Sequence, residues 1–215
     1  MGGQTRITLH PLLEKRHRIY STWWGKLIRA DDWRNPVITS LILNSALLTL
    51  AFLRWDATHV ILSVLIGFVL GTLLEYVTHR GTFHQLWKIP VLKGLEDIHM
   101  PHHLEKNDGI NAGPFFYLPL YLMTFVLIFL ISGSVGLTCA LFSGIAFWFC
   151  AYEFSHDSHH AHESRPGMPV RRGRYLNFMC RFHTIHHDDD STVNFGISQP
   201  VWDFVFRTYQ PPRSL

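Results

Sequence analysis

The sequence predicts an all-α fold: an integral membrane four-helix transmembrane bundle beneath a cytosolic, histidine-rich helical cap. Three observations predict it. Charged residues make up only 16% of the 215 residues and 47% are hydrophobic, whereas soluble domains are usually about one quarter charged. The sequence contains four long apolar runs. Eleven of the 15 histidines stand in four groups at or between the ends of these runs.

The four apolar runs predict membrane helices. A bilayer needs about 20 apolar residues per helix, and the first run is slightly shorter than this. Arg54, Trp55 and Asp56 form a tight turn after the first run, and Gly133 forms the turn between the last two. We expect spans at residues 37–53, 59–78, 115–131 and 134–152, all within one domain at residues 37–215.

Residues 1–36 form a basic segment that also carries Trp23, Trp24 and Trp33. Basic residues and tryptophans beside a span suit the headgroup layer of a membrane. We therefore expect an interfacial segment with a short helix, and for residues 1–15 a disordered basic tail is an equal alternative. The segment lacks the apolar run of a cleavable signal peptide, so we expect the internal spans to direct insertion.

The distribution of basic residues predicts the orientation. Seven Lys and Arg residues lie in residues 1–36, four in 79–114 and seven in 153–215, whereas the turns on the other side contribute only Arg54. Cytoplasmic loops of membrane proteins are enriched in these residues. We therefore predict a multi-pass protein with both termini and every histidine group on the cytoplasmic side. The formal charge of +3 is too small to indicate a nucleic acid partner.

The histidine groups have the spacing of metal ligands. Residues three or four apart share one face of a helix, and a doublet after a two-residue gap can offer one imidazole to each of two metals. The first pair is five residues apart, which fits if the helix ends or distorts at Gly81. In the third group we favour the pair four residues apart and leave the ring between them, His159, as a less certain ligand. The groups are His79 and His84; His99, His102 and His103; His156, His159 and His160; and His183, His186 and His187.

The number of imidazoles favours two metal ions. A mononuclear site uses about three or four protein ligands, and these groups supply roughly eight to ten imidazoles. We therefore predict a di-metal site in the cap. A neutral imidazole adds no charge beside lipid when it binds a metal. The remaining histidines, His10, His17, His59 and His162, are expected not to bind metal.

Three carboxylates are expected to support the ligands. Imidazoles that bind metal usually donate their other N–H to a carboxylate or carbonyl. Glu75 and Glu153 stand at the ends of spans, where an unpaired carboxylate is costly. Asp157 lies inside the third histidine group. The three aspartates at residues 188–190 are more simply explained as solvated loop residues.

At these residues the chain resembles the fatty acid hydroxylase and sterol desaturase superfamily of histidine-rich integral membrane di-iron enzymes, and is closest to its fatty acid 2-hydroxylase branch. The last motif is the most specific, because its H-x-x-H-H is followed by an Asn194-Phe195-Gly196 turn and a W-D-x-x-F-x-T ending. The matching segments are EYVTHRGTFH at 75–84, HMPHH at 99–103, HDSHH at 156–160 and RFHTIHHDDDSTVNFGISQPVWDFVFRT at 181–208.

The resemblance implies an O2-dependent monooxygenase of lipid metabolism whose non-haem di-iron site hydroxylates a lipid acyl chain. The implied cofactors are two Fe ions, which Zn can replace, with O2 as co-substrate. The implied partners are a membrane lipid substrate and a separate electron donor, either cytochrome b5-like or a ferredoxin with its reductase. No catalytic residue is expected beyond the metal ligands. The implied ligands are His79, His84, His99, His102, His103, His156, His160, His183, His186 and His187.

We expect the spans to form an apolar slot for the lipid chain. Plain packing is an equal alternative for its four expected lining residues, which are Phe115, Phe116, Tyr117 and Trp148. A group of arginines suits an anionic headgroup or an acidic electron carrier, although positive-inside anchoring explains them as well. These are Arg165, Arg171, Arg172 and Arg174.

Two alternative functions stay open. A lipid or sterol desaturase, or a carotenoid hydroxylase, would use the same ligands, because desaturation shares the first hydrogen abstraction. A non-catalytic metal-binding membrane protein or transporter is less expected. Transport sites place ionisable ligands near the middle of the membrane, and no histidine group lies mid-span.

Overall fold

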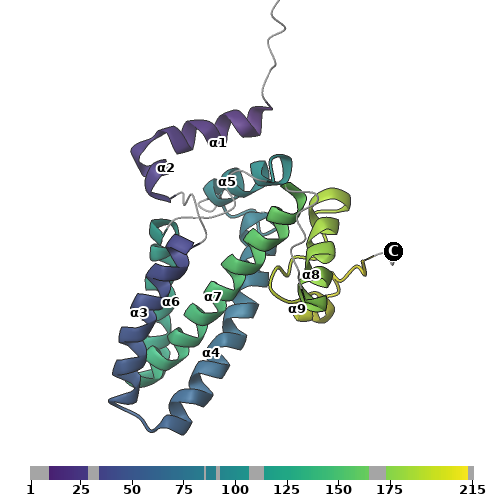
Figure 1. Ribbon diagram of the computed structural model, residues 1–215. Coiled ribbons are helices and arrows are strands. Elements are labelled where there is room, and N and C mark those ends of the chain that lie inside the picture. The colour runs from purple at the N-terminus through teal and green to yellow at the C-terminus, as the bar shows by residue number, and fades with distance from the viewer. Residues whose placement is uncertain are drawn as a thin grey trace, which may run out of the picture.

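The structure, a computed structural model, describes most of the chain, and the described part contains helices and irregular segments but no β-strand (Figure 1). The predicted all-α class is confirmed for these residues. They are residues 10–28, 34–84, 86–90, 93–106, 114–164 and 173–212.

Four long helices coincide with the four predicted apolar runs. The central helix is α7, which packs against the other three. The helix α7 continues beyond residue 152, the predicted end of the fourth span, to Ser164 and therefore carries the third histidine group itself. A helix does not have to end where its apolar run ends. The four helices are α3 (Arg34–Phe52), α4 (Ala57–Thr78), α6 (Pro114–Ser132) and α7 (Val135–Ser164) (Figure 1).

Two helical stretches are long and apolar enough to cross a membrane. They are Ala57–Phe83, with 27 residues, and Val135–His160, with 26 residues. The apolar stretches of the other two long helices are shorter, at Pro36–Phe52 and Tyr117–Ser132. Two of the four predicted spans are therefore long and apolar enough to cross a membrane.

Glycines bring α4 and α7 into direct backbone contact. A Cβ atom added to Gly67 would lie 1.9 Å from the carbonyl oxygen of Leu141, and one added to Gly144 would lie 2.1 Å from that of Val64. Gly67 and Gly71 form a G-x-x-x-G pattern on α4. Small residues at this spacing let membrane helices approach closely, and a side chain at either contact would force the two helices apart.

The polarity of α4 is inverted relative to a helix in a soluble protein. Its buried residues include Ser63 and Glu75, whereas Leu65, Ile66 and Val69 are each more than half exposed. Burial of apolar surface is the main favourable contribution to folding in water. An outward apolar face of this kind is typical of a helix in an apolar medium, as the length and composition of α4 also allow.

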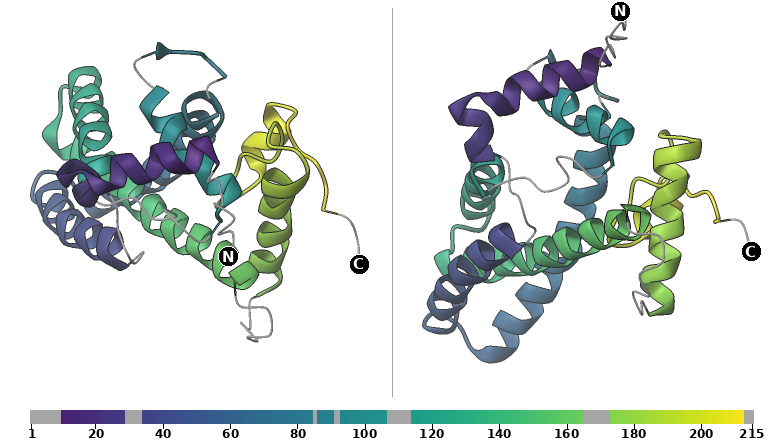
Figure 2. Two further views of the ribbon diagram at one scale, coloured as in Figure 1. Left: turned by 90° about the horizontal axis from the view of Figure 1, so that it is seen from above. Right: turned by 45° about the horizontal axis from the view of Figure 1, so that its top comes forward.

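Two helices from the N-terminal segment, α1 (Pro11–Ser21) and α2 (Trp23–Ile28), lie across one end of the bundle, with α1 beside α5 (Lys93–Leu104) (Figures 1 and 2). The helix expected in the N-terminal segment is thus present, and residues 1–9 lie outside the described part. Between the second and third long helices, α5 is a helix of the expected histidine-rich cap. The α1–α5 contact includes ion pairs from Lys15 to Asp97 and from the fully buried Arg16 to Glu105.

The C-terminal part packs beside the same end of α4 and α7. It contains α8 (Arg174–Thr184), the π-helix η3 (Ile185–Asp189) and the short α9 (Val201–Val205). A second π-helix, η1 (His79–Phe83), follows α4 directly. This is the helix distortion that the five-residue spacing of the first histidine pair predicted at Gly81.

An apolar cluster ties the C-terminal segment to the bundle. Four of its buried members come from α7, namely Ile145, Trp148, Phe149 and Tyr152, and the fifth is Ile197. Burying large apolar side chains contributes about 1.5–3 kcal/mol each. The segment that precedes α9 is therefore held against the helix that carries His156 and His160.

Candidate metal centre

Four separate parts of the chain bring their histidines to one place. The first pair lies on and directly after η1, the second group on α5, the third on α7, and the fourth on α8 and η3. All ten imidazoles that were expected as ligands lie in two adjacent groups or in contact with one of them. Most of these rings are buried.

Group A contains five imidazoles whose ligand nitrogens all lie within 4.8 Å of one another: His79, His84, His99, His103 and His186. Their Nε2 atoms converge. The separation is 3.2 Å between His79 and His99, 3.3 Å between His79 and His84, and 3.0 Å between His84 and His186. The rings of this group come from η1, α5 and η3.

Group B contains four imidazoles whose ligand nitrogens also lie within 4.8 Å of one another: His102, His156, His160 and His187. The Nε2 atom of His102 lies 3.3 Å from that of His156 and 3.1 Å from that of His160. His183 adjoins this group, with its Nε2 atom 3.2 Å from that of His160. The rings come from α5, α7, α8 and η3.

Two of the three histidine doublets are divided between the two groups. On α5, His103 belongs to group A and His102 to group B; on η3, His186 belongs to group A and His187 to group B. This is the division that the doublet spacing predicted. The rings of His103 and His187 stack across the boundary with centroids 4.2 Å apart, so the two groups are direct neighbours.

His159 faces away from both groups. Its Nε2 atom lies 3.1 Å from the carbonyl oxygen of Ile197, whereas His156 and His160 on the same helix both belong to group B. The geometry therefore places the favoured ligand pair, His156 and His160, in group B and leaves the less certain ligand, His159, outside it. The side chain of His162 lies outside the described part of the chain.

Main-chain carbonyls fix the protonation of two rings in group A. The Nδ1 atom of His79 donates to the carbonyl oxygen of Phe195 at 2.6 Å, and that of His186 donates to Val193 at 2.7 Å. A carbonyl can only accept a hydrogen bond, so the proton of each neutral ring is on Nδ1. The Nε2 lone pairs of both rings therefore point into the group.

Burial keeps the imidazoles neutral. Burial, reinforced by neighbouring histidines, lowers the pKa of His84 to about 2 and that of His103 to about 3. Burial also lowers the pKa of His186 to about 4 and holds those of His99 and His102 well below the usual range. A neutral imidazole offers a lone pair to a metal.

The donor set fits transition-metal ions. Two nitrogens that bind one ion at about 2.1 Å lie about 3.0 Å apart at a right angle and about 3.4 Å apart at a tetrahedral angle. Eight pairs of Nε2 atoms within the groups lie 3.0–3.3 Å apart, and all ligand atoms of a group lie within 4.8 Å of one another. Both nitrogens of His187 are buried without a hydrogen-bond partner in the described residues. The two groups can thus hold metal ions.

Three alternate carbonyls of one segment accept from histidines. Those of Val193 and Phe195 accept from group A rings, and that of Ile197 accepts from His159. We call residues 193–197 the carbonyl ladder. One short segment thus supplies main-chain acceptors to three rings.

The predicted role of Glu75 needs correction. It was expected to accept an imidazole N–H, but its carboxylate accepts from the main-chain N–H groups of Ile197 and Ser198 and from the indole N–H of Trp148. It therefore supports the histidines indirectly, by anchoring the end of the carbonyl ladder. Glu153 is buried and accepts from the hydroxyl of Tyr117 at 3.0 Å. Asp157 is half-buried on α7.

Asp203, the aspartate of the W-D-x-x-F-x-T ending, anchors the middle of the carbonyl ladder, a role that was not predicted from the sequence. Its carboxylate is fully buried and accepts from the main-chain N–H groups of Phe195 at 2.8 Å and Gly196 at 2.9 Å. It also accepts from the hydroxyl of Thr208. A single carboxylate within the apolar run VWDFVF was the available signal, because a buried charge needs partners.

Asn194 explains the Asn-Phe-Gly turn. Its φ angle of 55° lies in the left-handed region, which Asn tolerates better than most residues. Its side-chain amide donates to the carbonyls of Phe182 and Gln210, and its oxygen accepts from the N–H of Gln210. The side chain thus joins α8, the carbonyl ladder and the C-terminal segment after α9.

The other predicted site residues are only partly described. Tyr117 and Trp148 donate to carboxylates and pack against Phe149, which favours their packing alternative. The side chains of Phe115 and Phe116 and the whole of Arg165, Arg171 and Arg172 lie outside the described part.

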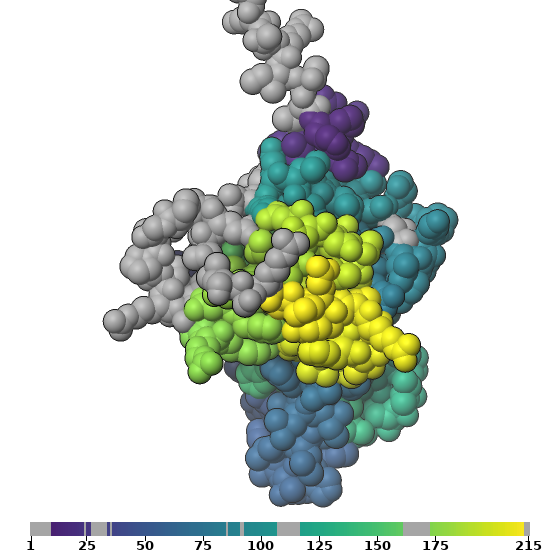
Figure 3. Space-filling view, turned by 90° about the vertical axis from the view of Figure 1, so that its right-hand side faces the viewer, coloured from purple at the N-terminus to yellow at the C-terminus, as the bar shows by residue number. Residues whose placement is uncertain are grey.

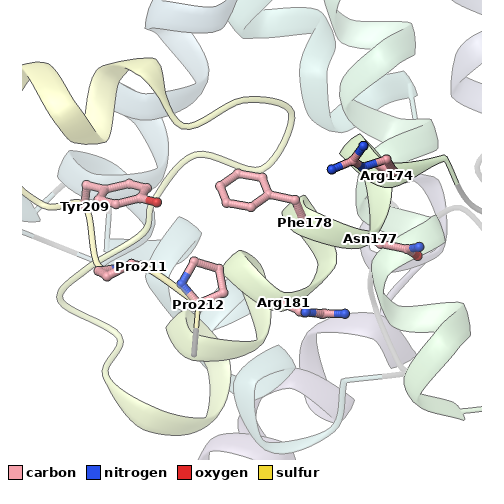
Figure 4. Close-up of a pocket in the computed structure, with 7 residues that line it drawn as sticks. All are labelled: Arg174, Asn177, Phe178, Arg181, Tyr209, Pro211 and Pro212. Atoms are coloured by element: carbon pink, nitrogen blue, oxygen red, sulfur yellow. The ribbon is translucent and has the colours of Figure 1, made fainter. Parts of the chain in front are cut away.

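Arg174 lines a surface pocket on the outer face of α8, with a volume of about 380 Å³. Figure 4 shows Phe178 pointing across it toward Tyr209. Arg174 and Arg181 lie two helical turns apart, whereas His183 of the same helix is buried in the histidine cluster. This pocket is therefore separate from the metal centre. Its lining residues are Arg174, Asn177, Phe178, Arg181, Tyr209, Pro211 and Pro212.

The fold and the site together define an all-helical protein with a buried cluster of neutral imidazoles that can hold metal ions. Residues 64–208 match the fatty acid hydroxylase family, and the chain belongs to that family. The resemblance seen in the sequence motifs is thereby confirmed.

Relatives within the family include fatty acid 2-hydroxylases. A dihydroceramide fatty acyl 2-hydroxylase of Arabidopsis thaliana is 26% identical, over 87% of this chain and 77% of its own length. A fatty acid 2-hydroxylase of Rattus norvegicus is 31% identical over 87% of this chain, which spans 51% of the rat protein. The solved structure of full-length scs7p, in which only the hydroxylase domain is visible, shares the fold with a TM-score of 0.77. The two chains are 20% identical, and the match covers 91% of this chain and 72% of that one.

Proposed function

We propose that the protein is an O2-dependent, non-haem di-iron hydroxylase of a lipid acyl chain. The observation that carries the proposal is the pair of adjacent groups of converging, neutral imidazoles. Membership of the fatty acid hydroxylase family and the 2-hydroxylase relatives support hydroxylation over desaturation. Redox chemistry on a hydrocarbon favours iron among the metals that imidazole binds.

The residues of the two groups divide the work of holding the ions. Group A would hold one ion and group B, with His183, the other. When bound, a reduced iron pair supplies the activation of O2 and the removal of hydrogen from an unactivated C–H bond. The protein holds the Nε2 lone pairs of His79 and His186 toward group A through the carbonyl ladder. It also limits water at the site by burying most of the rings.

We further propose that α3, α4, α6 and α7 form a four-span bundle, with both termini and the metal centre on the cytoplasmic side. The 19-residue helices α3 and α6 are about 28 Å long at 1.5 Å per residue, close to the roughly 30 Å of a bilayer core. The excess of basic residues on the histidine side supports this orientation.

The reaction would need two partners: a membrane lipid as substrate and a separate electron donor, cytochrome b5-like or a ferredoxin with its reductase. The exposed Arg174 and Arg181 on α8 are candidates for contact with an acidic carrier. Their helix also carries His183 to the metal centre on its buried side, so a carrier bound there would lie one helix diameter, about 10–12 Å, from the site.

Lipid analysis tests the proposed reaction. Cells that express the chain in air should accumulate acyl chains one oxygen atom heavier, and cells without oxygen should not. The variant His160→Ala should abolish the product, and His17→Ala, at an exposed position on α1, should retain it. A product lighter by two hydrogen atoms would identify a desaturase instead, and an unchanged lipid profile with bound metal would favour a non-catalytic metal-binding protein.

A further inference from the structure

The short helix α9 has its polarity reversed. Its one fully buried residue is the acidic Asp203, which is 0% exposed. Its apolar residues face outward, with exposures of 55% for Val201, 57% for Phe204 and 58% for Val205, and Phe206 directly after it is 45% exposed. Leaving such side chains in water forgoes about 1.5–3 kcal/mol for each, so this arrangement fits an apolar medium.

The apolar surface of α9 continues that of α4. The exposed large apolar residues of α4 run from Ile61 to Leu70, and the indole N–H of Trp202 donates to the hydroxyl of Thr72 at 3.0 Å. This bond fixes α9 beside the point at which the exposed apolar belt of α4 ends. Figure 3 shows the yellow C-terminal region directly above the blue surface of α4.

The depth of α9 corresponds to a membrane boundary. Thr72 lies six residues before the end of α4 at Thr78, which is about 9 Å along the helix axis. Trp202 lies among the apolar residues and the exposed Arg207 follows them, and tryptophan and arginine are typical of the headgroup layer. Helices that lie in this layer bury their apolar face about 5–10 Å into it.

We infer that the outer face of α9, formed by Val201, Phe204, Val205 and Phe206, inserts into the cytoplasmic leaflet at the boundary between headgroups and acyl chains. The inference rests on the proposed membrane topology and adds a lipid contact by a segment outside the four spans. Continuity with the lipid-facing belt of α4 favours lipid over a second copy of the chain as the occupant. The contact links the bilayer surface to the carbonyl ladder, since Asp203 on the inner face of the same helix holds Phe195 and Gly196.

Spin labelling of the full-length chain tests this contact. A nitroxide is attached at Val205→Cys, with Phe204→Cys as a second site, in a background with Cys139, Cys150 and Cys180 replaced by alanine. The protein is reconstituted in dioleoylphosphatidylcholine vesicles. Collision with O2, which concentrates in lipid, is compared with collision with a water-soluble nickel chelate. Leu65→Cys on α4 is the lipid control, and Arg174→Cys on α8 is the water control.

The expected result is a severalfold higher ratio of O2 to nickel accessibility at Val205 than at Arg174, close to the ratio at Leu65. A ratio at Val205 equal to that at Arg174 would overturn the inference and leave the membrane topology intact. Shielding from both reagents at both test sites would show a protein neighbour and would also overturn it. If the label at Leu65 itself behaves as in water, the proposed topology fails and the inference falls with it.

Discussion

The carbonyl oxygen of Phe195 lies 2.6 Å from the Nδ1 atom of His79, which is 116 residues earlier in the chain. One hydrogen bond thus joins the end of a long apolar helix to the C-terminal segment. It also sets which nitrogen of His79 faces group A. Because the acceptor belongs to the main chain, its position depends on the side chains that hold residues 193–197, and those side chains can be tested.

Replacing Asp203 with asparagine should lower metal binding. The asparagine amide offers one acceptor oxygen in place of two, so one of the N–H groups of Phe195 and Gly196 loses its partner, at a cost of about 1–3 kcal/mol. Loss of a supporting hydrogen bond at a metal site typically costs about 10–100-fold in metal affinity. Metal content after dialysis against graded chelator measures this.

The matched control for this variant is Asp189→Asn, at an exposed aspartate on η3. It should retain the wild-type metal content and melting temperature. If Asp203→Asn melts earlier but binds metal as tightly as the wild-type chain, Asp203 supports the fold alone and its proposed effect on the ligands is wrong.

Single alanine substitutions should separate the two groups. His186→Ala removes a ligand from group A and His187→Ala removes one from group B. Each should leave about half of the bound iron, because the other group keeps its ligands. Elemental analysis of purified protein gives the ratio of metal to chain. Complete loss of metal in both variants would show one cooperative site in place of two separable ones.

His159→Ala should retain the full metal content. The ring of His159 contacts the carbonyl of Ile197 and lies outside both groups. Losing a buried hydrogen bond of this kind costs about 0.5–1.5 kcal/mol of unfolding free energy, so a small decrease in melting temperature is expected. A loss of metal as large as that of His160→Ala would instead make His159 a ligand.

Two glycine substitutions should have opposite effects. Gly67→Ala places a Cβ atom 1.9 Å from the carbonyl oxygen of Leu141, whereas a Cβ atom at Gly94 on α5 meets nothing within 4 Å. Overpacking of this kind typically costs about 1–3 kcal/mol, and Gly→Ala in an open helical position gains up to about 1 kcal/mol. Thermal unfolding in detergent micelles should show the difference, and equal melting temperatures would argue against close α4–α7 contact.

Acidic pH should destabilise the metal-free protein. Burial lowers the pKa of His84 to about 2 and that of His103 to about 3, compared with about 6.5 in an unfolded chain. Between these values the unfolded chain binds more protons, so stability falls as the pH drops below about 6.5, by up to about 1.4 kcal/mol per pH unit for each imidazole. Melting temperatures measured from about pH 7.5 to about pH 5.5 test this window. A constant value across it would mean that the rings titrate normally in the folded state.

The sequence best predicted those features of the fold and site that depend on a single physical requirement, such as an apolar helix surface or a helical spacing. Apolar runs located all four long helices, because a lipid-facing helix needs a continuous apolar surface. Histidine spacing predicted both the distortion near Gly81 and the division of the doublets His102–His103 and His186–His187, because helical periodicity relates residue spacing to direction. These features depend only on local sequence.

Long-range and main-chain features could not be predicted. The bounds of α5 were not predicted, although its histidine spacing indicated a helix, because Gly94 and Pro101 disfavour a helical interpretation and its apolar residues are few. The carbonyl acceptors of Phe195 and Val193 have no sequence signature, since every residue has a carbonyl. The partner of Glu75 was misjudged for the same reason, because an imidazole and a main-chain N–H are equally good donors to a carboxylate.

The use of main-chain acceptors has an evolutionary consequence. Substitution at Val193 or Phe195 leaves the carbonyl in place as long as the backbone path is kept, so the tautomers of His186 and His79 tolerate sequence drift at the residues that touch them. Purifying selection on ring orientation should act instead at Glu75 and Asp203, whose hydrogen bonds position the main chain that carries these carbonyls.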